Sequence, residues 1–100
     1  PEYFQVVREG MRLTTTEIGT APVMASLPIA IGAKTGTAEL GVDRKRVNSW
    51  FIGFAPFDNP KIAIATVLEG GHVSNLVGAT TATKHMIEWL IIYRPDMLGI

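Results

Sequence analysis

The sequence predicts an α+β fold made of a helix, a three-stranded antiparallel meander and a C-terminal helix. Two observations lead to this prediction. Apolar residues recur at near-helical spacing towards both ends of the chain, and three apolar runs of strand length lie between them. Short segments rich in turn-forming residues separate the three runs, as expected for strands that follow one another as antiparallel neighbours.

The first helix is expected over residues 2–13. Pro1 suits the first turn of a helix, because the N–H that proline lacks would have no partner there. The apolar residues of this segment at near-helical spacing are Tyr3, Phe4, Val6, Val7 and Met11. Three threonines at 14–16 and Gly19 end the helix, and residues 17–27 are expected to form an irregular connection.

Three strands are expected in the middle of the chain. The first covers residues 28–40 and the second covers residues 49–55, with a polar hairpin loop at 41–48 between them. A strong turn signal at 57–60 follows the second strand. The third strand is expected over residues 61–69, where large and small apolar side chains alternate as in a strand covered on both faces.

The last helix is expected to run to about Tyr93. The glycine pair at 70–71 is expected to break the third strand, and Ser74 or Asn75 can cap the helix. The Arg-Pro pair at 94–95 ends it, because proline disfavours helical geometry in the residue before it. The apolar positions at helical spacing are Leu76, Ala79, Ala82, Met86, Leu90 and Tyr93.

Three aromatic side chains are expected to contribute to the core. Trp50 and Phe54 fall on one face of the second strand, because side chains alternate between the two faces of a strand. Trp89 is expected to pack the last helix onto the sheet. For Trp50 and Phe54, a core position is favoured over a ligand platform.

The composition excludes several classes of function. Nine basic and nine acidic side chains give a formal net charge of zero, so no clustered basic surface for nucleic acid is expected. The densest basic run, Arg44-Lys45-Arg46, is interpreted as a solvated loop. The absence of cysteine excludes disulfides and thiol catalysis, and two histidines without matching carboxylates make a poor metal site.

The low content of charged residues indicates whether this chain folds by itself or as part of a larger unit. Charged residues are 18% of this chain, against about 25% in a typical soluble domain, although a small domain has a large surface for its volume. One interpretation is a compact apolar domain. The favoured interpretation is a piece of a larger protein, with apolar faces that need partners outside this chain.

The run Lys34-Thr35-Gly36-Thr37 is unusual for the interior of a strand, where lysine is depleted and glycine is weakening. The threonine hydroxyls and the strand N–H groups can donate to an anion or an oxyanion, and the lysine can supply positive charge. The alternative is an edge strand with a solvated lysine and two threonines that favour β-structure.

The surrounding residues distinguish these interpretations. Residues 33–39 (AKTGTAE) resemble the third motif of the penicillin-binding protein and serine β-lactamase superfamily. Gly19-Thr20-Ala21 before the strand, and residues 49–56 after it, are similar to what transpeptidases of that family carry in the same order. The run at 67–71 (VLEGG) resembles the class B, elongation-type enzymes more than the division-type ones.

The resemblance implies that residues 1–100 are the C-terminal portion of a larger transpeptidase fold. The family's S-x-x-K and S-x-N motifs, which supply the nucleophilic serine and a second hydroxyl, precede the K-T-G strand. Neither motif occurs in a suitable place here, and Ser26, Ser49 and Ser74 are not followed by lysine three residues later. The chain alone is therefore expected to be inactive, with the missing N-terminal part as its partner or, failing that, a second copy of itself.

The resemblance also implies the activity of the parent protein. It would be a bacterial peptidoglycan D,D-transpeptidase, anchored in the cytoplasmic membrane with its catalytic domain outside, that binds D-Ala-D-Ala stem peptides and β-lactams and uses no cofactor. Lys34 and Thr37 would be catalytic, and Thr35, Gly36 and Thr37 would bind substrate. Two alternatives remain: a β-lactam sensor or serine β-lactamase, and a non-catalytic interaction domain of the same fold.

Overall fold

The chain folds into the predicted order of elements. The computed structural model describes residues 1–74 and 78–100. Its main elements are α1 (Glu2–Thr14), β1 (Gly32–Leu40), β2 (Arg46–Ala55), β3 (Ile62–His72) and α2 (Ala79–Tyr93). Two short 3-10 helices, η1 (Pro22–Ser26) and η2 (Pro95–Leu98), precede β1 and follow α2. The predicted α+β class and its helix, meander, helix order are confirmed.

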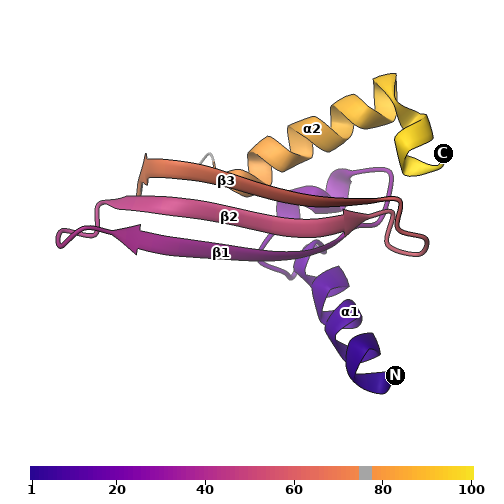
Figure 1. Ribbon diagram of the computed structural model, residues 1–100, viewed down its shortest axis with the longest axis horizontal. Coiled ribbons are helices and arrows are strands. Elements are labelled where there is room, and N and C mark those ends of the chain that lie inside the picture. Colours follow the sequence, from indigo (N-terminus) through magenta and orange to yellow (C-terminus); the bar gives the residue numbers. More distant parts are fainter. Residues whose placement is uncertain (75–77) are drawn as a thin grey trace.

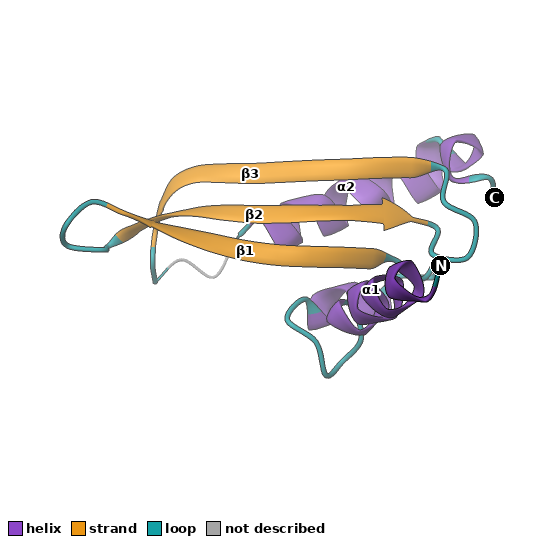
Figure 2. Cartoon of the chain, turned by 60° about the horizontal axis from the view of Figure 1, so that its bottom comes forward, coloured by secondary structure: helices purple, strands orange, loops and turns teal. Residues whose placement is uncertain are grey.

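The strands form one antiparallel sheet in the order β1-β2-β3. Helix α2 runs along one face of this sheet, while α1 meets it near the start of β1 (Figure 1). The hairpin that joins β1 to β2 extends past the start of α2, so its loop lies at the opposite end of the molecule from both termini (Figure 2). Strand β1 is an edge strand, since β2 is its single neighbour within the described residues.

The core lies between the sheet and a layer formed by η1, α2 and η2. Side chains alternate along β2, and those of Phe51 and Ala55 turn towards this layer and are fully buried. The buried apolar residues that pack together are Ala21, Met24, Leu27, Ile31, Ala33, Phe51, Ala55, Ala79, Ile87, Leu90 and Leu98.

The predicted core positions of the tryptophans are wrong. Trp50 is 44% exposed because the buried face of β2 is the one that carries Phe51, and residue 50 points the other way. Trp89 is 53% exposed and packs against Tyr93 with the rings tilted by 38° and 5.2 Å between their centroids. Phe54 is half-buried beneath the guanidinium of Arg8, which lies 5.5 Å from the ring centroid.

The first two strands have different limits from those predicted. Strand β1 begins at Gly32 and not at residue 28, because Pro28 has no N–H for the ladder and residues 28–31 connect η1 to the sheet. Strand β2 begins three residues before the predicted position, so the hairpin loop covers 41–45. Gly41 and Arg44 take up positive φ values of 73° and 56° within this loop.

The predicted break of β3 at the glycine pair does not occur. The strand continues to His72, which pairs with Arg46 across a register shift in β2 between Val47 and Ser49. Gly70 adopts a φ of 66° and donates its N–H to the Asn48 side-chain oxygen at 3.0 Å. Glycine tolerates this left-handed geometry, so the strand forms a bulge and then resumes pairing.

Helix α2 begins at Ala79, and the acceptor for its first N–H group is a side chain of the sheet. The Ala79 N–H donates to the Ser49 hydroxyl at 2.9 Å. Ser74 does not cap the helix and instead lies 2.7 Å from a ring nitrogen of His72. The other predicted cap, Asn75, and the predicted helical position Leu76 lie outside the described residues.

Candidate active-site strand

The run predicted to bind substrate lies in the middle of β1, on the unpaired side of the sheet. Lys34, Gly36 and Thr37 are exposed, and Thr35 is half-buried. Lys34 and Gly36 pair with Ile52 and Trp50 of β2 and share their face of the sheet. Lys34 and the two threonines therefore lie on opposite faces of the strand.

Thr35 and Thr37 occupy the face that carries Phe51 and Ser49, their partners in β2. The Thr35 hydroxyl lies 2.9 Å from the hydroxyl of Thr20, which belongs to the connection between α1 and η1. Ser49, which pairs with Thr37, accepts a hydrogen bond from the first N–H of α2 through its hydroxyl. Thr35 is thus tied to the connection after α1, and the β2 partner of Thr37 is tied to the start of α2.

The backbone of β1 presents polar groups along its free edge. The Lys34 ammonium donates to the Thr35 carbonyl, which places that carbonyl outside the ladder with β2. In an antiparallel pair, hydrogen-bonded and non-hydrogen-bonded residues alternate, so residue 37 faces the same edge as residue 35. The N–H of Thr37 is therefore available to an acceptor that approaches this edge.

Gly36 has space around it that Gly32 and Gly53, the glycines nearest to it in the sheet, do not have. A Cβ at position 36 would have a single near neighbour, the Trp50 Cβ at 3.9 Å, which is ordinary van der Waals contact. A Cβ at Gly32 would meet the Phe54 ring at 2.5 Å, and one at Gly53 would meet the Gly32 oxygen at 2.7 Å. Packing within the described residues therefore excludes a Cβ at 53, where the neighbour is backbone, disfavours one at 32, where the Phe54 ring would have to move, and permits one at 36.

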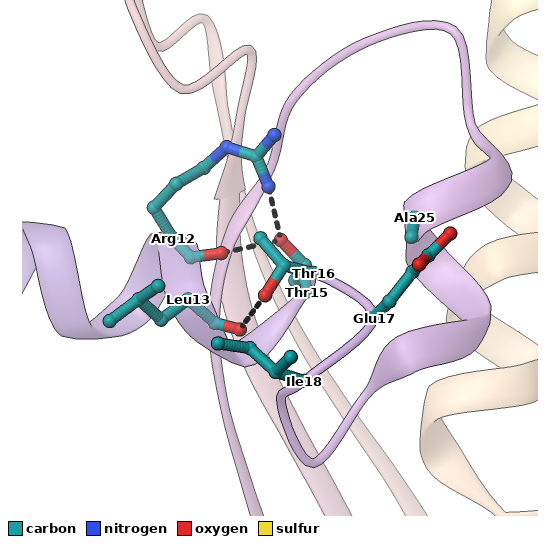
Figure 3. Close-up of a pocket in the computed structure, with 7 residues that line it drawn as sticks. All are labelled: Arg12, Leu13, Thr15, Thr16, Glu17, Ile18 and Ala25. Carbon is teal, nitrogen blue, oxygen red and sulfur yellow. Dashed lines mark hydrogen bonds between the residues drawn. The ribbon is translucent and has the colours of Figure 1, made fainter.

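A hollow lies away from this strand, between the end of α1 and η1 (Figure 3). It measures about 430 Å³ and is lined by Arg12, Leu13, Thr15, Thr16, Glu17, Ile18 and Ala25. Its hydroxyls are already engaged, since Thr16 donates to the Leu13 carbonyl at 2.7 Å and Thr15 to the Ile31 carbonyl at 2.6 Å. The hollow holds none of the predicted site residues, and its chemistry does not make it a catalytic site.

The described residues lack the features of a metal site and of a membrane-spanning helix. Residues 1–74 and 78–100 hold no group of three histidine, aspartate or glutamate side chains arranged to bind a metal ion. None of the helices in this described part has the length and apolar character needed to cross a bilayer.

The family of the chain follows from comparison with known proteins. Residues 1–87 match the family described as "Penicillin binding protein transpeptidase domain". The chain belongs to this family. Its relatives include the peptidoglycan D,D-transpeptidase MrdA of Escherichia coli, which is 32% identical over 105 residues. That alignment covers 90% of this chain and 16% of MrdA, and it supports the class B, elongation-type interpretation of the sequence.

Solved penicillin-binding proteins share this fold. Penicillin-binding protein 2B from Streptococcus pneumoniae superposes with a TM-score of 0.73 and 25% identity, covering 91% of this chain and 16% of that one. The penicillin G acyl-enzyme complex of penicillin-binding protein A from Mycobacterium tuberculosis gives a TM-score of 0.59 and 31% identity, covering 87% and 20%. The chain therefore spans about one fifth or less of the length of these relatives.

Two residues near the site strand carry contacts that sequence reasoning did not assign. The sequence places Thr20 in a family-like tripeptide and Ser49 in a family-like strand, excludes Ser49 as the serine of an S-x-x-K motif, and indicates no contact for either side chain. Both act across long sequence separations, 15 residues for Thr20 and Thr35 and 30 for Ser49 and Ala79. Local spacing contains no signal for contacts of this kind.

Proposed function

We propose that the chain is the C-terminal portion of a serine-type peptidoglycan D,D-transpeptidase domain and that β1 is the strand against which substrate and β-lactams bind. The observation that carries this proposal is the exposed Lys34-Thr35-Gly36-Thr37 run on a free sheet edge, in a chain of the transpeptidase family. Gly36 supports it, because packing does not require glycine there and a ligand lying against the strand would.

Each residue of the run has a role in this proposal. The hydroxyls of Thr35 and Thr37 donate to the carboxylate that both substrate and β-lactam carry beside the reacting carbonyl. The Thr37 N–H, on the free edge, forms half of the oxyanion hole, and the N–H of the nucleophilic serine forms the other half. Lys34 makes the site electropositive and holds the hydroxyl of the S-x-N motif.

The reaction proceeds through a serine acyl-enzyme. The serine oxygen bonds to the carbonyl carbon of the penultimate D-Ala as the bond to the terminal D-Ala breaks, and D-Ala leaves with the transferred proton. The amine of a second stem peptide then attacks the ester carbonyl and releases the serine. A β-lactam acylates the same serine by opening its ring. The serine and the S-x-N motif belong to the part of the domain that precedes this sequence.

The exposed apolar surface of α1 supports a larger folding unit. None of its residues is buried, although Tyr3, Phe4 and Val6 are apolar or largely apolar and are 80%, 71% and 67% exposed. Large exposed apolar patches mark contact surfaces. The partner of this surface is the N-terminal part of the transpeptidase domain, which would lie, with the rest of the domain, outside the cytoplasmic membrane of a bacterium and be anchored to that membrane.

The alternatives differ in the fate of the acyl-enzyme. A serine β-lactamase hydrolyses it quickly, whereas a transpeptidase holds a penicillin adduct for a long time. A non-catalytic interaction domain forms no adduct. The relatives named above are called D,D-transpeptidases or penicillin-binding proteins, which favours the transpeptidase.

The test uses the full-length protein that carries this segment. It should form a one-to-one adduct with a fluorescent penicillin, seen by mass spectrometry, and the adduct should persist after free penicillin is removed. Lys34→Ala should strongly reduce the acylation rate, because it removes a positive charge from the site. Wild-type acylation rates in both Lys34→Ala and Gly36→Val would show that β1 does not line the site and would overturn the proposal.

A further inference from the structure

We propose that Thr20 is a positioning residue of the carboxylate site, which donates its hydroxyl proton to Thr35 so that the Thr35 proton points to the ligand. This inference rests on the proposed function. It starts from the 2.9 Å contact between the two hydroxyls, which join the connection after α1 to the middle of β1. Both side chains are accessible enough for a ligand carboxylate to reach Thr35.

The turn that carries Thr20 is held on both sides. Ala21 is buried and donates its N–H to the Thr14 carbonyl at 2.9 Å, while Gly19 donates to the Thr16 carbonyl at 3.0 Å. A Cβ at Gly19 would lie 2.2 Å from the Thr14 oxygen, so a larger residue there would displace the turn. Thr20 is therefore fixed against the end of α1 with little freedom to move away from Thr35.

The start of the site strand is tied to the same turn. The buried Thr15 hydroxyl donates to the Ile31 carbonyl at 2.6 Å, one residue before β1 begins. This bond fixes the distance between the turn and the strand independently of Thr20. The contact between Thr20 and Thr35 is thus made by two segments that are already in place, and its loss need not unfold either segment.

The number of available protons decides the direction of the hydrogen bond. A hydroxyl donates once and accepts twice, so either threonine can be the donor when no ligand is present. A carboxylate offers acceptors alone, and Thr35 can donate to it when its own oxygen accepts from Thr20. In this arrangement the two hydrogen bonds run in series, and each strengthens the other. Thr20 then supports carboxylate binding without touching the ligand.

The experiment compares acylation of the full-length protein by penicillin G and by its methyl ester, which lacks the free carboxylate. Thr20→Val should lower the acylation rate with penicillin G by about three- to ten-fold, the usual effect of one hydrogen bond between neutral groups. With the methyl ester, Thr20→Val should react at the wild-type rate. Thr20→Ser keeps the hydroxyl and should restore most of the rate with penicillin G.

Thr35→Val is the matched control, and the double variant tests the coupling. Thr35→Val should lower the acylation rate with penicillin G but not with the methyl ester. Adding Thr20→Val to this variant should lower the rate with penicillin G little further, because the two hydroxyls act in series. Equal losses with penicillin G and the ester, or no loss with either in Thr20→Val, would overturn the role of Thr20 and leave the proposed function standing. An unchanged rate with penicillin G in Thr35→Val would overturn both.

Discussion

Gly36 and Gly53 are both glycines of one sheet, but they have different reasons for lacking a side chain. Gly53 faces the Gly32 carbonyl within the sheet, so the fold itself excludes a Cβ at that position. Gly36 is exposed, and its backbone conformation is one that other residues adopt. At the residue scale, these two positions separate the requirements of folding from those of ligand binding.

Gly36→Val should leave the fold largely intact and abolish acylation by penicillin in the full-length protein. Valine favours strands, and its Cβ would meet the Trp50 Cβ at a comfortable 3.9 Å, but the branched side chain would occupy the space of the ligand. The melting temperature and the acylation rate measure the two effects separately. Gly53→Ala is the control and should lower stability by about 1–3 kcal/mol through overpacking. A Gly36→Val protein that acylates normally would contradict the assignment.

Thr37→Val should reduce acylation by roughly ten- to a hundred-fold. The substitution keeps the shape of the side chain and the backbone N–H but removes the hydroxyl that, in the proposed function, donates to the ligand carboxylate. Loss of one hydrogen bond to a charged group costs about 1.5–3 kcal/mol, which gives the expected range of rates. The second-order acylation rate with one penicillin measures it. A rate within two-fold of wild type would mean that Thr37 contributes through its backbone alone.

At the scale of elements, Ser49 of β2 connects the sheet to α2. Its hydroxyl accepts the Ala79 N–H, and Gly78 lets the two segments approach, since a Cβ there would lie 2.8 Å from the Ser49 oxygen. Helix α2 is further held by the Thr83 hydroxyl, 2.8 Å from the Thr66 hydroxyl of β3. Because Ser49 pairs with Thr37, these contacts place the start of α2 on the face of the sheet to which the Thr37 side chain belongs.

Ser49→Ala should destabilise the full-length protein by about 1 kcal/mol, the usual loss when a helix N-terminus loses a hydroxyl partner. Thermal unfolding of the transpeptidase domain measures this change. Ser74→Ala is the matched control, because the sequence predicts Ser74 as a cap, whereas in the structure it bonds to His72. If Ser74→Ala were the more destabilising variant, the assignment of the cap to Ser49 would be wrong.

The same elements show what the sequence could and could not predict. Helical spacing and turn residues were sufficient for the number and order of the α-helices and strands, because these depend on local patterns, but the two 3-10 helices were not predicted. The cap of α2 comes from a residue 30 positions away, and the continuation of β3 past 70–71 depends on Asn48 across the ladder. The exposure of Trp50 depends on which face of β2 receives α2. These features are tertiary, so local patterns do not contain them.

The candidate site divides in the same way. The run stood out because lysine and glycine in a strand interior conflict with β propensity, but its role as a site was implied by the resemblance of residues 33–39 to the family motif. The placement of the run on a free edge agrees with the predicted meander, in which the first strand has one neighbour, and with the edge-strand alternative. The partner of Thr35 was missed, because Thr20 lies in a segment predicted as an irregular connection.

At the scale of the whole molecule, the chain alone should form no covalent adduct with penicillin. The sequence has no serine with a lysine three residues later, and a transpeptidase needs an activated nucleophile to be acylated. Mass spectrometry of the isolated chain after incubation with penicillin G measures this directly, with the full-length protein as positive control. A stoichiometric adduct on the isolated chain would mean that the nucleophile lies within these 100 residues and would contradict the proposed division of the site.

The isolated chain should also not exist as a stable folded monomer. A domain of this size buries a smaller fraction of its surface on folding than a larger domain does. Its stability therefore depends on burying most of its apolar side chains. Here the apolar side chains of α1 are exposed, as are Ile52 and Trp50 on the outer face of the sheet. We therefore expect the chain to associate with itself or to lack a cooperative thermal transition, and to become monodisperse when co-expressed with the N-terminal part of the domain. Sedimentation at low concentration together with calorimetry decides the matter, since a monomeric mass with a cooperative transition would show that the contacts within residues 1–100 are sufficient for folding.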